Sequence, residues 1–414
     1  MAVRADTRRW LIVAALFVVT YGVSVPLAAY GVFLPVIAEH FGWTRGAVSA
    51  ALSLNLLVGG IAGFAVGTLA DRHGPRVLLA ATMALAGTGF ALVAAVSTLW
   101  QLYLLVGLVA GVGTSSFYVL GTATVTHWFE DRRGLALALV LIGFNLGYIT
   151  GGPAAAWLIT RLGWRVAYCM LGSGCGLVTT IAALGVRLPR QAERAALRRP
   201  RPAVAAGAAR GGAHGITLLE SLTDPRQWAL NVSWLLIGGI AIMISVHAVP
   251  FARDQGVSLT GASLALTAYG IGSAIGRLLG GTLSDRVGAR RTIAAAFVLQ
   301  IAALVGLLWV PSRAGLLLSL MAFGAGFAAS DTVVAQVVPQ VFGMRALGAI
   351  MGILTLGWRC GAAIGPALAG FLYDLTGSYR IPFGLAPLGV LLSWALFLLA
   401  TARNGRTRTR AAAT

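Results

Sequence analysis

The sequence predicts an all-α integral membrane protein whose twelve transmembrane helices form two pseudo-symmetric six-helix bundles. Three observations lead to this fold class: the chain is strongly apolar, its apolar segments have the length of membrane spans, and its two halves repeat one another. Of the 414 residues, 58% are hydrophobic and only 10% are charged, whereas soluble domains carry about 25% charged residues. Water alone cannot solvate a surface of this kind, so we expect lipid around it.

The predicted spans are apolar segments of about 20 residues or more, the length that crosses a hydrocarbon core about 30 Å thick as a helix. The segments are 10–37, 46–70, 76–96, 100–128, 134–160, 163–186, 227–252, 258–284, 292–310, 314–341, 346–373 and 380–401. The 54 glycines suit such a bundle, because small residues let transmembrane helices approach closely. The first segment is too long for a signal peptide, so we expect it to remain as the first span.

The two halves of the chain repeat a motif. Residues 67–76 read GTLADRHGPR and residues 281–290 read GTLSDRVGAR, which agree at seven of ten positions. Parallel repeats of this kind are typical of transporters that rock two bundles around a central site. We therefore predict one bundle over residues 1–186 and a second over 227–414, joined by a basic cytoplasmic linker over 187–226.

The distribution of the basic residues along the chain indicates the membrane topology. The formal net charge is +19, and all 31 basic residues are arginine. If the N-terminus is cytoplasmic, 23 of the 31 fall in cytoplasmic segments and six in outside segments, which is the positive-inside bias. We therefore expect a multi-pass protein of the cell (inner) membrane with both termini in the cytoplasm, in contact with the lipid bilayer and with no nucleic-acid partner.

Motifs for catalysis are missing from the sequence. The three cysteines have no metal-ligand spacing, no nucleophile and base stand out together, and there is no nucleotide-binding loop. We expect a protein that is not an enzyme, binds no metal or cofactor, works as a monomer, and takes its driving force from a proton gradient.

The motif GTLADRHGPR resembles the signature loop of the major facilitator superfamily, at its place between spans 2 and 3 and again between spans 8 and 9. The resemblance implies the twelve-span fold and a conformational latch that holds in one state and breaks in the other. An acid at a helix end beside arginines can form charge-assisted contacts, and Gly74 permits a sharp turn. The alternative is a solvated turn. The residues assigned to the latch are Gly67, Asp71, Arg72, Gly74, Arg76, Asp285, Arg286 and Arg132.

A narrower resemblance concerns three segments. Residues 128–138 (WFEDRRGLALA), and residues 30–35 (YGVFLP) followed by FGWT at 41–44, are similar to signatures of monocarboxylate transporters and their bacterial relatives, including oxalate/formate antiporters. Arg277, within SAIGRLLGG, matches the substrate arginine that this group carries in span 8. The sequence departs from the animal members at Ser273, where they place an acid that takes part in proton coupling, and it lacks their span 1 lysine.

Three charged residues lie well inside predicted spans: Arg277, Asp331 and Arg359. An uncompensated guanidinium in hydrocarbon costs several kcal/mol at least, so each arginine needs an anion. Asp331 and Arg359 are each fourteen residues from Arg345 and therefore at a similar depth, which suggests an ion pair between them. That pairing would leave Arg277 for a substrate carboxylate in bidentate geometry, unless Arg277 snorkels to the interface. The resemblance to oxalate/formate antiporters implies a second cation in span 11, a part that Arg359 could play. The alternative is that its neighbour Cys360 faces the cavity instead of Arg359.

Other polar groups complete the candidate set. His247 is the only histidine well inside a span, and its ordinary pKa near 6.5 suits proton exchange, although a hydrogen-bonded core histidine is the alternative. Tyr118 aligns with Asp331 at an offset of 213 residues, so the two are expected at equivalent places. The substrate-binding candidates are Arg277, Tyr118, His247, Ser273, Asn145, Leu27, Cys360 and Arg359, and the proton-coupling candidates are Asp331 and His247.

The sequence therefore predicts a secondary transporter that moves a small carboxylate, most simply a lactate-like monocarboxylate, together with a proton. One alternative is exchange of a dicarboxylate for a monocarboxylate, with Arg277 and Arg359 acting together. Another is efflux of a hydrophobic drug, with Arg277 purely structural. A non-transporting receptor ranks last, because the linker contains no evident signalling domain.

Overall fold

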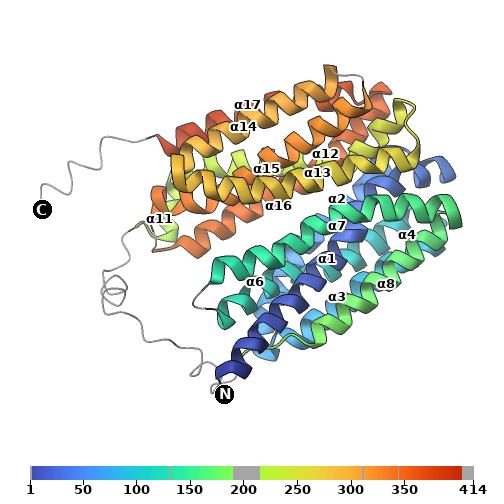
Figure 1. Cartoon of the computed structure of the whole chain (residues 1–414). Coiled ribbons are helices and arrows are strands. Elements are labelled where there is room, and N and C mark those ends of the chain that lie inside the picture. The colour runs from blue at the N-terminus through green and yellow to red at the C-terminus, as the bar shows by residue number, and fades with distance from the viewer. Residues whose placement is uncertain (1, 130–131, 190–214, 310–311, 344, 403–414) are drawn as a thin grey trace, which may run out of the picture.

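The computed structural model is built almost wholly of helices that form two bundles, one from each half of the chain (Figure 1). The structure describes residues 2–129, 132–189, 215–309, 312–343 and 345–402. Within these ranges, twelve helical stretches are long and apolar enough to cross a membrane. The predicted fold class and number of spans are confirmed.

The N-terminal bundle contains α1 (Ala2–Phe41), α2 (Arg45–His73), α3 (Pro75–Leu92), α7 (Arg133–Leu162) and α8 (Trp164–Leu184). Its fourth span is made of several pieces: α4 (Leu99–Leu102), a π-helical stretch (Tyr103–Val109), α5 (Ala110–Thr114) and α6 (Ser116–Trp128). The C-terminal bundle contains α12 (Pro225–Asp254), α13 (Leu259–Val287), α14 (Ala289–Trp309), α15 (Arg313–Phe342), α16 (Leu347–Thr376) and α17 (Arg380–Thr401). The described end of the predicted linker holds one short helix, α11 (Leu218–Thr223).

The two signature loops are glycine turns with the same geometry. Gly74 follows α2 with φ +77° and its N–H donates to the carbonyl of Ala70, and Gly288 follows α13 with φ +92° and its N–H donates to the carbonyl of Ser284. A side chain at either position would strain the backbone, because a positive φ favours glycine. The matching glycines of the sequence repeat therefore end equivalent helices in the two halves.

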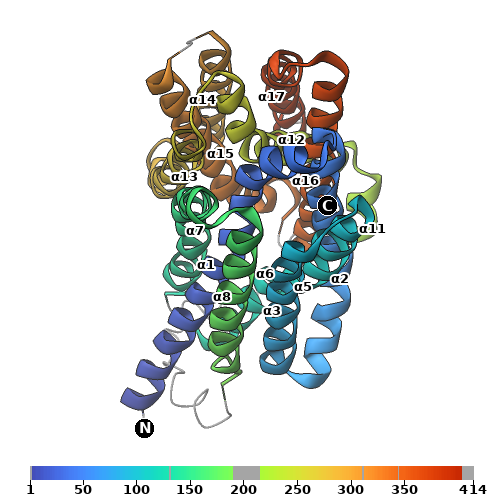
Figure 2. The same cartoon turned by 90° about the vertical axis from the view of Figure 1, so that its right-hand side faces the viewer.

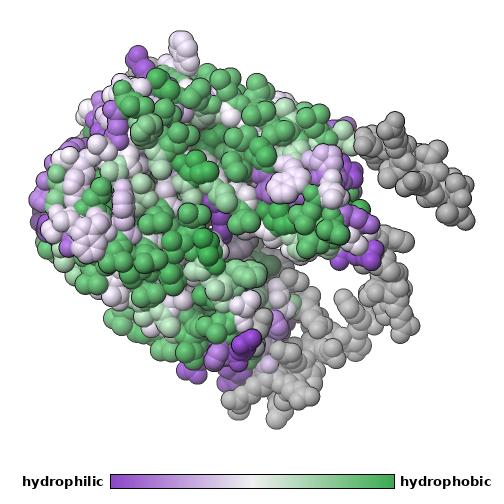
Figure 3. Space-filling model, turned by 180° about the vertical axis from the view of Figure 1, so that it is seen from behind, coloured by the Kyte–Doolittle hydropathy of each residue, from purple (hydrophilic) through white to green (hydrophobic). Residues whose placement is uncertain are grey.

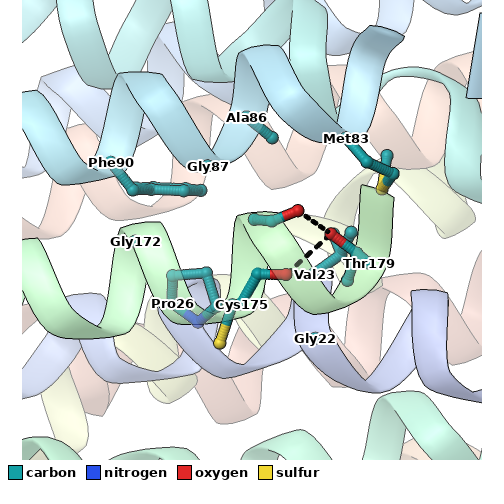
Figure 4. Close-up of a pocket in the computed structure, with 11 residues that line it drawn as sticks. Gly22, Val23, Pro26, Met83, Ala86, Gly87, Phe90, Gly172, Cys175 and Thr179 are labelled. Carbon is teal, nitrogen blue, oxygen red and sulfur yellow. Dashed lines mark hydrogen bonds between the residues drawn. The ribbon is translucent and has the colours of Figure 1, made fainter. Parts of the chain in front are cut away.

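Small residues bring neighbouring helices into close contact. Between α3 and α8, a Cβ added at Gly87 would collide with the backbone of Gly176, and a Cβ added at Gly172 would collide with Ala91. Figure 4 shows this contact region, where the hydroxyl of Thr179 is bonded to carbonyls of its own helix and the remaining hollow is only about 10 Å³. A space of that size holds one water molecule at most, so this region is helix packing and no binding site.

The outside of the bundles is apolar. Large hydrophobic side chains such as Ile61, Leu177, Leu388 and Leu399 are more than half exposed, and the space-filling view shows broad hydrophobic surface (Figure 3). Exposed apolar area on this scale is typical of a surface that faces lipid.

The bundles meet at one end of the molecule and diverge toward the other. We call the end near the N-terminus and the signature turns Gly74 and Gly288 the linker side, and the opposite end, near Arg45 and Asp254, the far side. In Figure 1 the two halves separate toward the linker side, in Figure 2 they are seen from the far side, and Figure 3 shows a hollow between them. The contacts between bundles pair α1 with α12, α2 with α16, and α7 with α13.

Candidate functional site

Arg277 has a protein partner. Its terminal nitrogen Nη1 donates to the carboxylate of Asp331, on the neighbouring helix α15, at 3.1 Å. The two side chains are 26% and 33% exposed, and Nε of Arg277 is buried without a hydrogen-bond partner. The prediction that Arg277 is the unpaired guanidinium is therefore wrong. Helix α13 packs closely along α15, and this contact, which sequence spacing does not reveal, brings Arg277 to the acid.

Arg359, and not Arg277, is the arginine without an anionic partner among the three charged residues well inside the described spans. Within the described part of the chain, its guanidinium has no ion pair and no hydrogen bond, so the expected pair with Asp331 is absent. The side chain extends from α16 toward α2 of the other bundle, where a Cβ built on Gly60 would lie 3.3 Å from its Cδ and a Cβ built on Gly59 would lie 3.9 Å from Nη1. The two arginines and one acid leave one positive charge uncompensated.

A cavity of about 90 Å³ lies beside Arg359 and is lined by both bundles. Its aliphatic lining residues are Leu27, Leu52, Leu56, Ile242 and Val246, and its aromatic ones are Phe117, Phe144, Tyr148 and Trp358. Its remaining lining residues are Gly59, Asn55, Thr114, Ser245 and Arg359. Of the predicted binding residues, Leu27 and Arg359 therefore line this space. An apolar cavity with one cationic group is suited to an organic anion.

Tyr118 lies near both the ion pair of Arg277 with Asp331 and the guanidinium of Arg359. It is 43% exposed and lies close enough to Asp331, Arg277 and Arg359 to interact electrostatically with all three. Its ring contacts the ring of Phe117, which lines the cavity, with centroids 6.4 Å apart. The structure therefore brings four predicted residues, Tyr118, Asp331, Arg277 and Arg359, into one cluster between the bundles.

His247 lies elsewhere. Its side chain is fully buried in the C-terminal bundle, where Nε2 bonds the carbonyl of Pro366 at 2.9 Å and Nδ1 bonds the hydroxyl of Tyr379 at 2.9 Å. Burial raises the pKa of Tyr379 above its ordinary range, so the phenol keeps the proton that it donates to Nδ1. Both ring nitrogens are occupied by protein groups, and the placement contradicts the expectation that His247 meets substrate or protons in the cavity.

Three further candidates do not line the cavity. Ser273 is 4% exposed and donates to the carbonyl of Tyr269 in its own helix. Asn145 is 5% exposed, and its Nδ2 is buried without a partner. Cys360 is a half-buried free thiol beside Arg359. Arg359 lines the cavity and Cys360 does not, as expected because consecutive residues of a helix point about 100° apart.

The latch residues surround the signature turns on the linker side. Gly67 lies on α2, Gly74 forms its turn, and Arg132 precedes α7 in a left-handed conformation with φ +52°. The exposed residues are Arg72, Arg76, Arg132, Asp285 and Arg286. In the described part of the chain none of these five forms an ion pair, and the side chain of Asp71 lies outside it.

Sequence reasoning missed a polar cluster on the far side. Arg45, at the start of α2, donates two hydrogen bonds to the carboxylate of Asp254 in the other bundle, at 2.7 and 2.8 Å. Its guanidinium also lies over the ring of Tyr373, 4.1 Å from the centroid. Asp374 accepts hydrogen bonds from the backbone N–H groups of Arg45 and Gly46 at 3.0 and 2.8 Å. An arginine directly after the N-cap Thr44 was the available signal.

Comparison with known proteins gives a consistent result. A family model described as Major Facilitator Superfamily matches residues 12–251 and again residues 235–413. The chain is 30% identical to monocarboxylate transporter 11 of Homo sapiens over 395 residues, which covers 91% of this chain and 79% of that protein. It is 26% identical to a gallate transporter of Pseudomonas putida over 435 residues, or 97% and 93% of the two chains.

A solved structure shares the fold. The crystal structure of a bacterial homologue of the human lysosomal transporter Spinster, in an inward-facing and occupied conformation, superimposes with a TM-score of 0.73 at 17% identity and covers 95% of this chain and 96% of the other. At this identity the likeness concerns the arrangement of the helices.

Proposed function

Because the chain belongs to the major facilitator superfamily of transporters, we propose that it is a secondary transporter of small monocarboxylate anions, moved together with a proton across a cell membrane. The single observation that carries this proposal is the unpaired guanidinium of Arg359 in the cavity between the two bundles. A carboxylate there would gain two parallel charge-assisted hydrogen bonds and remove the cost of the uncompensated charge.

The pair of Arg277 and Asp331 supports a route for the proton. Protonation of Asp331 would remove the charge that holds Arg277 and release its guanidinium as a second donor for the cargo. The empty site carries two arginines and one carboxylate, and the loaded site adds one carboxylate and one proton, so its net charge is unchanged. We therefore propose electroneutral symport, with Tyr118 donating its hydroxyl to the carboxylate between the two arginines.

The names of the similar proteins support the same chemistry. Monocarboxylate transporters and a gallate transporter are named for carboxylic acids, and a carboxylate is what a guanidinium recognises best. The positive-inside bias supports a cytoplasmic linker side. On that orientation the hollow in Figure 3 opens toward the cytoplasm, and the far side faces outward.

Uptake by reconstituted protein tests the proposal. Proteoliposomes with an inward proton gradient should accumulate labelled monocarboxylate, and the Arg359→Ala variant should lose this uptake. Arg161→Gln is the matched control, because it removes an exposed arginine at the end of α7 without changing the cavity. Asp331→Asn should abolish the response to the proton gradient while leaving some exchange of labelled for unlabelled substrate. Uptake that is indifferent to Arg359 contradicts the proposal.

Anion exchange is the second candidate, favoured by the two guanidiniums that lie within electrostatic range of Tyr118. Arg277 and Arg359 together would hold a dicarboxylate if Asp331 were protonated or displaced. Counterflow of labelled oxalate into vesicles loaded with unlabelled oxalate or formate, faster than any uptake driven by a pH gradient, would favour exchange. The positive charge at the site argues against efflux of cationic drugs.

A further inference from the structure

The walls of the cavity indicate a cargo more apolar than lactate. We infer that the site selects monocarboxylates whose body is an aromatic ring, the benzoate class, with the carboxylate on Arg359 and the ring among the aromatic side chains. This inference rests on the proposed function and adds the substrate class.

The polar groups of the lining are mostly occupied by the protein. Nδ2 of Asn55 donates to the carbonyl of Val106 at 2.7 Å, and the hydroxyl of Thr114 donates to Oδ1 of Asn55 at 3.3 Å. The hydroxyl of Ser245 donates to a carbonyl of its own helix at 3.0 Å. A hydroxy acid such as lactate would bring its hydroxyl to walls where the donors of Asn55, Thr114 and Ser245 are already engaged and the unpartnered indole N–H of Trp358 is buried, which weakens its binding.

The apolar part of the lining is rich in rings. Phe117 on α6 and Phe144 on α7 are stacked, with centroids 5.8 Å apart and planes 6° apart, and Phe144 is followed by Tyr148 at 5.5 Å. Trp358 lines the same cavity from α16 of the other bundle. Aromatic rings attract further rings in offset or edge-to-face geometry beyond the gain from burial alone. A ring bound here would touch both halves of the molecule.

In the state described here, with Arg277 held by Asp331, the charges of the cavity favour a cargo with a single carboxylate. Arg359 is the cation that lines the cavity, and Arg277 is already paired with Asp331 at 3.1 Å. A second carboxylate on the cargo would lie against the apolar walls while Asp331 is ionised, at the cost of leaving an ion without a partner. Monocarboxylates are therefore favoured over dicarboxylates of similar size.

Competition in proteoliposomes tests the inference. Benzoate, cyclohexanecarboxylate and lactate are compared as inhibitors of labelled benzoate uptake. We expect benzoate to act at a concentration about tenfold below lactate, the factor that corresponds to one good aromatic contact. Cyclohexanecarboxylate has the same size without a π system, and it should fall between the other two.

Variants separate the ring from its surroundings. Phe144→Leu should reduce the preference for benzoate over lactate about threefold or more, and Phe144→Tyr should restore it because it keeps the ring. Trp358→Leu should have a similar effect, with Trp309→Leu as the matched control, since Trp309 is 79% exposed at the end of α14.

The outcomes distinguish this inference from the proposed function. If lactate competes as well as benzoate and uptake still requires Arg359, the aromatic preference is overturned while carboxylate transport stands. If no carboxylate competes and Arg359→Ala behaves as the unmodified protein does, both fail.

Discussion

The two ends of the interface between the bundles differ in how they are held. On the far side, Arg45 donates two hydrogen bonds to Asp254, a contact that we call the arginine clasp. Asp374 accepts hydrogen bonds from two backbone N–H groups of α2, and Arg253 forms an ion pair with Glu39 at 3.6 Å. On the linker side, the described latch residues form no ion pair across the interface. A Cβ added at Gly281, Gly348 or Gly352 would meet no neighbouring atom within 4 Å.

Close backbone packing follows the same division. A Cβ at Gly31 of α1 would lie 2.6 Å from the carbonyl oxygen of Val246 in α12, and the hydroxyl of Thr267 in α13 donates to the carbonyl of Ile149 in α7 at 2.8 Å. These contacts all join one bundle to the other. The difference teaches that a few polar groups and small residues hold the far side closed, and that they must separate before the far side can open.

Removing the arginine clasp should have the largest effect on this difference. Arg45→Ala deletes two charge-assisted hydrogen bonds and a contact with Tyr373, and bonds to charged groups contribute about 2 kcal/mol. We expect the far-side-open state to rise roughly 30-fold in population. The rate at which a membrane-impermeant thiol reagent labels Ser49→Cys, in a chain without native cysteines, measures this, because Ser49 is fully buried here.

Arg253→Ala is the matched control for the clasp. Its single contact with Glu39 is longer, and the two side chains are 30% and 62% exposed, so the change should be within about 0.5 kcal/mol. If both variants label at the same rate, the clasp does not hold the far side.

Asp374→Asn should have the next largest effect. The amide keeps one oxygen acceptor, so one of the two N–H groups at the start of α2 loses its partner, together with the favourable negative charge at that helix end. Such losses cost about 1 kcal/mol, which corresponds to roughly fivefold faster labelling of Ser49→Cys. Labelling slower than in the parent protein would contradict the role of Asp374.

Asp285→Asn should have the smallest effect, and its sign should be opposite. The exposed Asp285 forms no ion pair in the described structure, so this state loses nothing. If the latch holds the opposite state, labelling of Ser49→Cys should fall by less than about threefold while transport turnover slows. Faster labelling would show that Asp285 stabilises the far-side-closed state.

The fold followed from patterns that are local in sequence. Apolar length predicted the spans, and the repeat predicted equivalent turns, because Gly74 and Gly288 each meet the same backbone requirement without help from distant residues. These properties belong to single segments, and they do not depend on how a helix is rotated about its axis.

Which side chains meet in the site depends on how each helix is rotated about its axis, and spacing along the chain does not give that rotation. Equal distances from Arg345 placed Asp331 and Arg359 at the same depth, yet Asp331 faces Arg277 on α13. The total charge of the cluster was predicted correctly, and the assignment of the free arginine was not. The predicted role of His247 in the cavity was wrong for the same reason, because its partners Tyr379 and Pro366 are both distant from it in sequence.

The contact of Arg359 with Gly59 and Gly60 has a mechanical consequence. Its backbone belongs to one half of the molecule, and its aliphatic stem rests on the other. When the halves tilt, the guanidinium must slide along α2 or leave it, so on the proposed function the strength of cargo binding would change with the tilt itself.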